Sequence, residues 1–333
     1  MKEEVTLNKK EQRRLLILND LEKGRIKNKE AGDILGLSLR HVKRLRAAYR
    51  QEGAAALAHG NRGRKPAHVL DTGVKNQVVV LGRSTYAGCN HQHFTELLAE
   101  REGIIASRST IRRILLEAGI RSPRKRRPPK HRSRRERYPQ QGMLLQIDGS
   151  PHDWLEGRGP WLSLVGAIDD ATGNVPYALF REREDAQGYF LLLQQIVKSH
   201  GIPMVLYHDR HGIFERAKKD EETVEEQLKG KKIPTQFGRL MEELSITSIS
   251  ALSPQAKGRI ERLWGTFQDR LVSELRLAGA KTMTEAHRVL QNFLPRYNRR
   301  FAVPASQPGS AYRKPGRGFK PDEVFCALSI SGW

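Results

Sequence analysis

The sequence predicts a multidomain protein in which all-α helix-turn-helix domains precede an α/β core built on a mixed five-stranded sheet. Two helix-turn-helix patterns occupy residues 1–120, a strongly basic segment follows, and from Tyr138 strands and helices alternate in the order βββαβαβα. A helix-turn-helix domain is expected at residues 1–66 and a second similar domain at 67–120. A basic linker at 121–137 leads to the α/β core at 138–302, and a C-terminal tail follows at 303–333.

Positive charge is concentrated in the first half of the chain. The 333 residues carry a net charge of +22, with 33 basic and 14 acidic residues in 1–147 but 26 and 23 in 148–333. This distribution favours phosphate-backbone binding by the N-terminal part. A ribosomal-type protein usually lacks a large neutral domain, and a membrane-surface protein should have a basic amphipathic helix with exposed aromatics, which this sequence does not show. Without a secretory signal or an apolar run of ~20 residues, we expect a cytoplasmic protein associated with the bacterial nucleoid, with no membrane partner.

The first domain has the pattern of a helix-turn-helix. Residues 9–22 predict a first helix, Asn28 is expected to cap a second, Gly36 supplies the turn and Ser38 caps a third. One face of the third helix is apolar, with Leu39, Val42, Leu45 and Tyr49. The other faces carry basic candidates for DNA contact, namely Arg40, Lys43, Arg44 and Arg46. This arrangement favours entry of the third helix into the major groove. An ordinary helical hairpin with a solvated basic face is the alternative.

Residues 53–67 are rich in Gly and Arg and are predicted to form a linker along the DNA backbone, with Arg62, Arg64 and Lys65 as contacts. A second, less clear helix-turn-helix follows, whose last helix is capped by Ser107 or Ser109 and ended by Gly119. This helix adds two DNA-contact candidates, Arg112 and Arg113. The group Cys89, His91 and His93 suggests zinc, but no second Cys or His pair lies at the spacing of a zinc finger.

Residues 121–137 contain ten Lys or Arg and three prolines, with no apolar periodicity. We expect an extended basic linker that becomes ordered on nucleic acid rather than a mere solvated spacer. Its candidate DNA contacts are Arg124, Lys125, Arg126 and Arg127.

The core begins with three short apolar strands, at 143–148, 161–169 and 175–180, whose close connections predict an antiparallel meander. A helix capped by Asp185 leads to a fourth strand, 203–209, which should run parallel to one of the first three. The charged residues 215–232 are expected to form an exposed insertion. The remaining elements are a helix at 238–246, a strand at 246–250, a long helix at 258–277 and a helix opened by the capping box of Thr282 and Glu285.

Three acidic residues are the candidate site. Asp148 and Asp209 each end an apolar strand, so if these strands are parallel neighbours both side chains emerge at one edge of the sheet. Glu261 lies on the long helix, where Gly258 and Gly265 share its face and leave room for a ligand. Carboxylates without His or Cys partners suit Mg²⁺ or Mn²⁺, and two such ions support phosphodiester chemistry. The alternative is that each acid is a surface charge or turn residue, as expected for Asp169 and Asp170.

Several segments together resemble a known family: QIDGSPHDW, LVGAIDDATG, YHDRHGIF, SPQAKGRIERLWGTFQDRL and YNRRFAVPA. With the βββαβαβ order, they resemble the RNase H-like integrase core of DDE transposases, the ISNCY-type insertion-sequence transposases in particular, over roughly residues 1–325. The resemblance implies binding of transposon terminal inverted repeats in double-stranded DNA, donor cutting, attack of the 3′-hydroxyl on target DNA, and a homo-oligomer on DNA.

The same resemblance implies roles for the site residues. Asp148 would bridge two Mg²⁺ or Mn²⁺ ions, Asp209 and Glu261 would hold one each, and Lys257 and Arg259 would lie near the DNA end. Two features depart from the pattern. The interval from Asp209 to Glu261 is longer than in simpler integrase cores, and the chain stops at CALSISGW, where relatives usually continue into a small β-rich domain. The alternatives are therefore a truncated, catalytically inactive copy that only binds specific DNA, and a structure-selective nuclease on the same fold.

Overall fold

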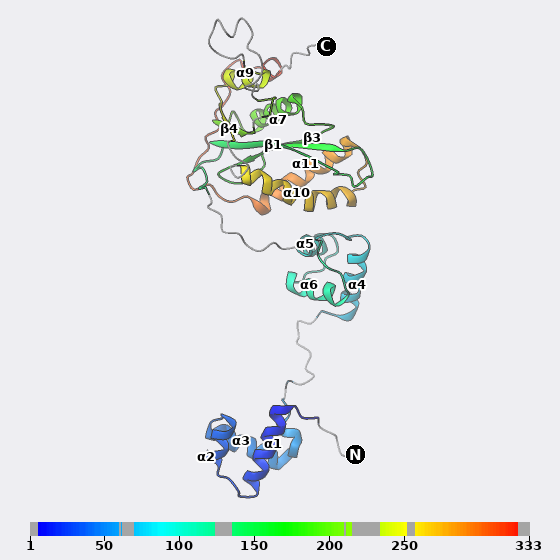
Figure 1. Ribbon diagram of the computed structural model, residues 1–333, viewed down its shortest axis with the longest axis vertical. Helices are drawn as coiled ribbons and strands as arrows, with labels where there is room; N and C mark the ends of the chain where they lie inside the picture. Colours follow the sequence, from blue (N-terminus) through cyan, green and yellow to red (C-terminus); the bar gives the residue numbers. More distant parts are fainter. Residues whose placement is uncertain are drawn as a thin grey trace. The chain divides into compact units, whose positions relative to one another are not determined.

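The computed structural model describes residues 6–59, 61, 70–123, 135–209, 211–214, 234–251 and 257–325 (Figure 1). Contacts divide the chain into two compact units, Met1–Asp71 and Thr72–Trp333. Several predicted features lie outside the described residues: most of the two Arg-rich segments, the charged insertion at 215–232 and the final CALSISGW. None of the helices in the described part of the chain combines the length and apolar composition that a membrane crossing requires.

The first unit is helical. It contains α1 (Lys9–Glu22), α2 (Asn28–Leu35), α3 (Leu39–Glu52) and the short 3₁₀ helix η1 (Gly53–Leu57). A small core holds them together, formed by Leu18, Leu21, Ala31, Val42 and Leu57. As predicted, Gly36 makes the turn with a φ of +64°, and the Ser38 hydroxyl accepts a hydrogen bond from the His41 backbone N–H at 3.3 Å.

Three expectations for this unit are wrong. Residues 53–57 are not linker, because Leu57 is buried and closes the core. Asn28 does not cap α2 but begins it; the preceding Lys27 is the capping position, and its backbone N–H donates to Glu30 Oε2 at 2.9 Å. Leu39 does not join the apolar face, since it is the first residue of α3 and 48% exposed.

The second unit begins with three helices, α4 (Thr72–Arg83), α5 (His91–Arg101) and α6 (Arg108–Glu117). Ser107 caps α6 by accepting from the Thr110 backbone N–H at 3.1 Å, and Gly119 ends the helix with a φ of +77°. The second helix-turn-helix pattern thus corresponds to a compact helical part with Phe94, Leu98 and Ile111 buried.

Charged residues join this helical part to the core, whose last long helices are α10 (Gly258–Leu277) and α11 (Met283–Phe301). Glu274 of α10 is buried and receives hydrogen bonds from Arg101 of α5 at 2.8 Å and Arg296 of α11 at 3.2 Å. A second buried pair links Glu96 of α5 to Arg270 of α10. Buried carboxylates need such partners, so these pairs define where α5 rests on the core.

The core sheet has the order β3-β2-β1-β4-β5. Its strands are β1 (Leu144–His152), β2 (Leu162–Asp169), β3 (Ala178–Arg181), β4 (Val205–His208) and β5 (Thr247–Ser250). The first three form the predicted antiparallel meander, while β4 runs parallel to both β1 and β5. The predicted crossover helix is α7 (Ala186–Ser199), whose N-terminus is capped by Asp185.

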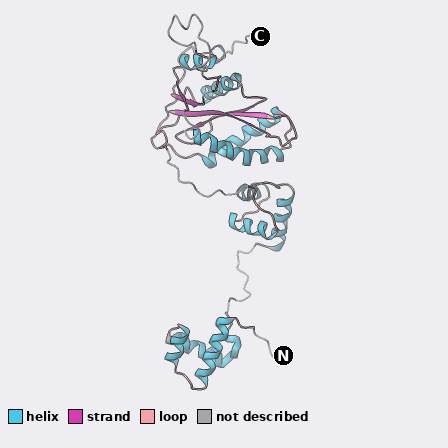
Figure 2. Ribbon diagram, viewed as in Figure 1, coloured by secondary structure: helices cyan, strands magenta, loops and turns pink. Residues whose placement is uncertain are grey.

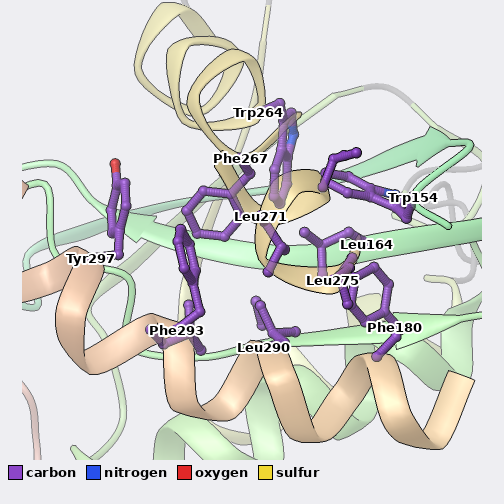
Figure 3. Close-up of a cluster of buried hydrophobic side chains, with 14 of the residues drawn as sticks. Trp154, Leu164, Phe180, Trp264, Phe267, Leu271, Leu275, Leu290, Phe293 and Tyr297 are labelled. Atoms are coloured by element: carbon purple, nitrogen blue, oxygen red, sulfur yellow. The ribbon is translucent and has the colours of Figure 1, made fainter. Parts of the chain in front are cut away.

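Helices cover both faces of the sheet (Figures 1 and 2). On one face lie α7 and α9 (Gln236–Glu243), which pack on Leu145, Ile147 and Val165. On the other lie α10 and α11, whose side chains pack on Leu164 and Phe180 (Figure 3). Thr282 and Glu285 form the predicted capping box of α11. The sheet is therefore enclosed between two helical layers, and α10 has a fixed position over β1 and β2.

Two features of the core differ from prediction. Strand β1 does not stop at Asp148 but continues to His152, because it stays paired with β2 after β4 has ended. The tail from residue 303 packs on the core up to Phe325, which is buried beside α7 and α9, and contains the short helix α12 (Pro321–Val324). The Ile202 backbone N–H donates to the Arg313 carbonyl at 2.8 Å, and the Arg313 N–H donates to the Ile202 carbonyl at 2.9 Å. These hydrogen bonds hold the described tail against the core.

Candidate active site

Asp148 and Asp209 lie side by side at the point where β4 ends. The parallel register pairs Leu144 with Val205 and Gln146 with Tyr207. Continued by two residues, this register places Asp148 beside Asp209, which directly follows β4. A crossover helix between parallel strands brings their ends to one edge of the sheet, as the sequence predicted.

Lys257, the residue before α10, contacts both carboxylates. Its Nζ lies 2.6 Å from Asp148 Oδ1 and 3.4 Å from Asp209 Oδ2. The Lys257 side chain is only 10% exposed, so its charge requires these partners. One cation therefore reaches oxygens of both acids. Two carboxylates that converge on a cation are the kind of donor set that Mg²⁺ or Mn²⁺ takes, and the pair fits a divalent metal in this respect.

Glu261 does not join the pair in this structure. It is exposed on the first turns of α10, and among the described residues no group of three His, Cys, Asp or Glu side chains is placed to hold a metal ion. The surface around it is open, because a side chain added at Gly265 would meet no atom within 4 Å, and one at Gly258 would meet only the end of Arg262. The glycines therefore leave space beside Glu261, as predicted, while the acid itself stays apart from Asp148 and Asp209.

Trp264, one turn after Glu261, also contacts the site. Its indole Nε1 donates to Asp148 Oδ2 at 3.0 Å, so each oxygen of Asp148 has a partner from α10 or the residue before it. In the sequence, Trp264 falls on the apolar stripe of this helix, with Ile260, Leu263, Phe267 and Leu271, which indicates a core role only. Its spacing of three residues from Glu261 was the available signal that it shares the site.

Asp170 lies in the turn after β2, as expected, but it is a buried anchor and not a surface charge. Its carboxylate has no exposed surface and accepts from Arg259 Nε at 2.6 Å and from the Tyr138 backbone N–H at 2.9 Å. It also pairs with Arg135, at the described end of the basic segment. Asp169 is buried as well and accepts from the Gly142 backbone N–H at 2.8 Å.

Gln146 extends this anchor to α10. Its Nε2 donates to Asp170 Oδ1 at 3.2 Å, and its Oε1 accepts from the Ile260 backbone N–H, also at 3.2 Å. The first N–H groups of a helix have no partner within the helix, so a buried side-chain acceptor fixes where the helix starts. Arg259 is consequently held inward, with its side chain 15% exposed and paired with Asp170.

A further acid, Glu184, lies against the backbone of Gly149, where any side chain would collide with its carboxylate. The Tyr189 hydroxyl donates to Glu184 Oε1. Burial raises the pKa of Tyr189 well above its usual value, and the negative charges of Glu184, Asp148 and Asp209 raise it further. Glu184 therefore adds a third carboxylate to the neighbourhood of Asp148 and Asp209, which favours a cation.

The candidate DNA contacts fall into three groups. Arg40, Lys43 and Arg44 are exposed on α3 of the first unit, and Arg112 and Arg113 are exposed on α6. Arg46 instead pairs with Glu22 of α1 at 2.5 Å and is held within its own domain. The residues Arg62, Arg64, Lys65, Arg124, Lys125, Arg126 and Arg127 lie outside the described part of the chain.

Comparison with known proteins adds two relatives. The homeodomain-like domain family matches residues 8–58, the first helical unit. The transposase for insertion sequence IS1202 of Streptococcus pneumoniae is 34% identical over 325 residues, covering 87% of this chain and 68% of the relative. "Putative transposase y4bF" of Sinorhizobium fredii is 39% identical over 311 residues, covering 93% of this chain and 66% of the relative. The chain thus spans about two thirds of the length of these relatives.

Two solved structures are also similar. A chain of the simian T-cell lymphotropic virus intasome in complex with PP2A regulatory subunit B56 gamma is 16% identical, with coverage of 73% of this chain and 80% of that chain and a TM-score of 0.39. The HTLV-2 integrase catalytic core domain in complex with magnesium is 14% identical, with coverage of 45% and 84% and a TM-score of 0.33. The strand order β3-β2-β1-β4-β5, with α7 and α10 on opposite faces, is that of an RNase H-like core.

Proposed function

This chain belongs to the insertion-sequence transposases, and on that premise we propose that it cuts transposon DNA and joins the ends to a target at the Asp148–Asp209 site. One observation carries the proposal. Two carboxylates from neighbouring parallel strands lie within reach of a single cation, at 2.6 and 3.4 Å from Lys257 Nζ. Few purely structural arrangements place two acids side by side at a sheet edge, because like charges repel unless a cation lies between them.

Asp148, Asp209 and Glu261 would hold two Mg²⁺ or Mn²⁺ ions. Bound there, such ions activate a water or a 3′-hydroxyl and stabilise the leaving oxygen of a phosphodiester. Glu261 would complete the set by turning toward the pair, and the open surface at Gly258 and Gly265 leaves space beside it. Asp148 would offer Oδ1 to such an ion, while the Trp264 indole N–H donates to Oδ2.

Lys257 has two successive tasks in this proposal. Before a metal binds, its ammonium neutralises Asp148 and Asp209 and keeps them together. With a divalent cation on those carboxylates, the Lys257 ammonium would be free to bind a DNA phosphate at the same edge. A lysine is suited to this exchange because its charge sits at the end of a flexible stem.

DNA binding is proposed for the helical parts. Arg40, Lys43 and Arg44 at the start of α3 would contact the terminal inverted repeat in the major groove. Arg112 and Arg113 on α6, and the basic segment ahead of Tyr138, would follow the phosphate backbone. The partners are therefore double-stranded transposon ends and target DNA, with a homo-oligomer assembled on them.

A second candidate is a protein that binds DNA without cutting it. It is favoured by Lys257, which occupies the position between the two acids, and by the exposed place of Glu261 away from them. A structure-selective nuclease is the third candidate, since an RNase H-like core can cut without recognising an end.

A joining assay separates these three. The full chain is incubated with duplexes that carry the element's terminal repeat, a target plasmid and Mg²⁺ or Mn²⁺. We expect joining of the repeat by the wild type and none by Glu261→Gln, while the exposed control Glu243→Gln joins normally. If the wild type binds the repeat specifically but does not cleave it, the non-cutting DNA-binding protein is supported. If it cuts a random duplex as well as the repeat, the nuclease is supported.

A further inference from the structure

The two oxygens of Asp148 have different partners. Oδ1 faces the Lys257 ammonium at 2.6 Å and, through it, Asp209. Oδ2 accepts a hydrogen bond from the Trp264 indole N–H at 3.0 Å. The Asp148 side chain is 18% exposed and Trp264 is 6% exposed, so solvent has little access to the bond between them. A neutral donor on one oxygen leaves the other for a cation.

The indole is held firmly in this position. Trp264 packs edge-on against Phe267, with ring centres 6.0 Å apart and planes at 75°, in the cluster under the sheet (Figure 3). In β2, the residue paired with Asp148 is Gly166. A side chain there would bring its Cβ to 2.9 Å from Trp264 Cη2, so the absence of one at Gly166 makes room for the ring. Strand β2, with Gly166, therefore holds the Trp264 ring in a position that favours one orientation of the Asp148 carboxylate.

We propose that Trp264 is a positioning residue that sets the orientation of the Asp148 carboxylate for metal binding. The inference rests on the function proposed above for this site. By holding Oδ2, the indole N–H keeps Oδ1 turned toward Asp209. The Asp148 side chain is then already oriented when a cation binds to both acids. Hydrogen bonds of this kind to metal-binding side chains raise metal affinity by fixing the ligand before the ion arrives.

The position of Trp264 on α10 adds a second consequence. Glu261 lies three residues earlier on the same helix, hence on nearly the same face. A shift of α10 that carries Glu261 would also move the indole on Asp148. The hydrogen bond from Trp264 thus links the orientation of Asp148 to the position of α10, the helix that carries Glu261.

The test measures Mn²⁺ binding directly on the full chain, by the electron paramagnetic resonance signal of free Mn²⁺. Trp264→Phe keeps most of the ring and removes the N–H. The matched control is Trp154→Phe, a buried tryptophan of the same cluster whose Nε1 donates to the Ser150 backbone oxygen at 3.1 Å. We expect Trp264→Phe to weaken Mn²⁺ binding about tenfold or more, as removal of such a supporting bond typically does, and Trp154→Phe to bind as the wild type does.

The joining assay supplies a second readout. For Trp264→Phe the Mn²⁺ concentration at half-maximal rate should rise by the same factor, while the rate at saturating Mn²⁺ recovers most of its wild-type value. Gly166→Ala, which retains the N–H but displaces the ring, should raise the half-maximal concentration in the same direction. It provides an independent variant if Trp264→Phe does not fold.

Unchanged Mn²⁺ affinity in Trp264→Phe, or an equal loss in Trp154→Phe, overturns the inference and assigns Trp264 to the core alone. Asp148→Asn distinguishes this result from failure of the proposed function. If Asp148→Asn loses Mn²⁺ binding while Trp264→Phe does not, the metal site stands and the positioning role fails. If Asp148→Asn also binds Mn²⁺ normally, the proposed metal site itself is wrong, and the positioning role falls with it.

Discussion

The Lys257 ammonium lies 2.6 Å from Asp148 Oδ1, between the two acids that the sequence pairs. A positive group in this position competes with any metal for the same oxygens. Replacing Lys257 by Gln leaves two neighbouring carboxylates without their cation, which strengthens the local negative potential. We predict that Lys257→Gln binds Mn²⁺ severalfold more tightly than the wild type and yet joins DNA ends more slowly, because the variant has no ammonium to bind the DNA phosphate.

The measurement for Lys257 is a Mn²⁺ titration alongside the joining rate at saturating metal. The exposed Lys281→Gln is the control with the same charge change, and it should alter neither quantity. Weaker Mn²⁺ binding by Lys257→Gln would mean that the ammonium supports the metal site rather than competing with it.

The arginines and lysines of α3 should separate into two classes. Lys43→Ala and Arg44→Ala each remove an exposed charge, so affinity for the terminal repeat should fall, and the slope of log affinity against log salt should drop by about 1 for each phosphate that the variant no longer binds. Arg46→Ala should leave that slope unchanged and instead lower the free energy of unfolding slightly, because Arg46 pairs with Glu22. A salt titration of DNA binding and urea unfolding distinguish the two; an Arg46→Ala slope like that of Lys43→Ala would contradict the assignment.

Asp170→Asn should damage both the core and the site. The change leaves Arg259 and Arg135 beside a neutral group and weakens the anchor of the first turn of α10. Loss of one partner from a buried ion pair costs about 3 kcal/mol or more, so we expect a clear fall in urea stability and a lower joining rate. Asp153→Asn, in a partly exposed turn where Asp153 Oδ1 accepts from the Gly157 N–H, is the control and should cost less than about 1 kcal/mol. Equal losses of stability in Asp170→Asn and Asp153→Asn would contradict the anchoring role of Asp170.

Glu274 gives the contact between α5 and the core a dependence on pH. Burial by itself raises the pKa of Glu274, but the hydrogen bond from His93 and the charges of Arg296 and Arg101 outweigh it and lower the pKa from 4.5 to about 2. A lowered pKa in the folded state contributes stability that is present above about pH 4.5 and is lost as the pH falls toward 2. The wild type should therefore exceed Glu274→Gln in stability at pH 7, and this difference should shrink between pH 4.5 and 2. Thermal unfolding across this range measures the difference, and a constant gap would contradict the pairing.

Local patterns predicted most of the elements. The apolar spacing from Ile260 to Leu271 marked α10, whose bounds, Gly258–Leu277, agree with the prediction. The capping box at Thr282 and the cap at Asp185 placed the starts of α11 and α7. These succeed because helix capping and helical periodicity depend on residues three or four apart. The direction of β4 also followed, because a strand reached through a crossover helix runs parallel to its neighbour. That this neighbour is β1, which brings Asp148 beside Asp209, was left open by the sequence.

The contacts that organise the site could not be predicted in this way. Trp264 and Asp148 are 116 residues apart, and Arg259 and Asp170 are 89 apart, so no local pattern relates them. The sequence placed Asp170 in a turn, and it is there, but its burial depends on Arg135 and Arg259, which come from opposite sides of it in the sequence. The extension of β1 beyond Asp148 likewise depends on its partner β2, since Gly149 to His152 have little apolar character of their own.

The most direct measurement of the central claim is a structure of the full chain with terminal-repeat DNA and Mn²⁺, in which anomalous scattering locates the metal. We predict a Mn²⁺ peak within about 2.1 to 2.3 Å of a carboxylate oxygen from each of Asp148 and Asp209, with the Lys257 ammonium displaced toward a DNA phosphate and Glu261 turned toward the metals. A structure at saturating Mn²⁺ in which Lys257 still bridges the two acids and no peak lies between them would contradict the account.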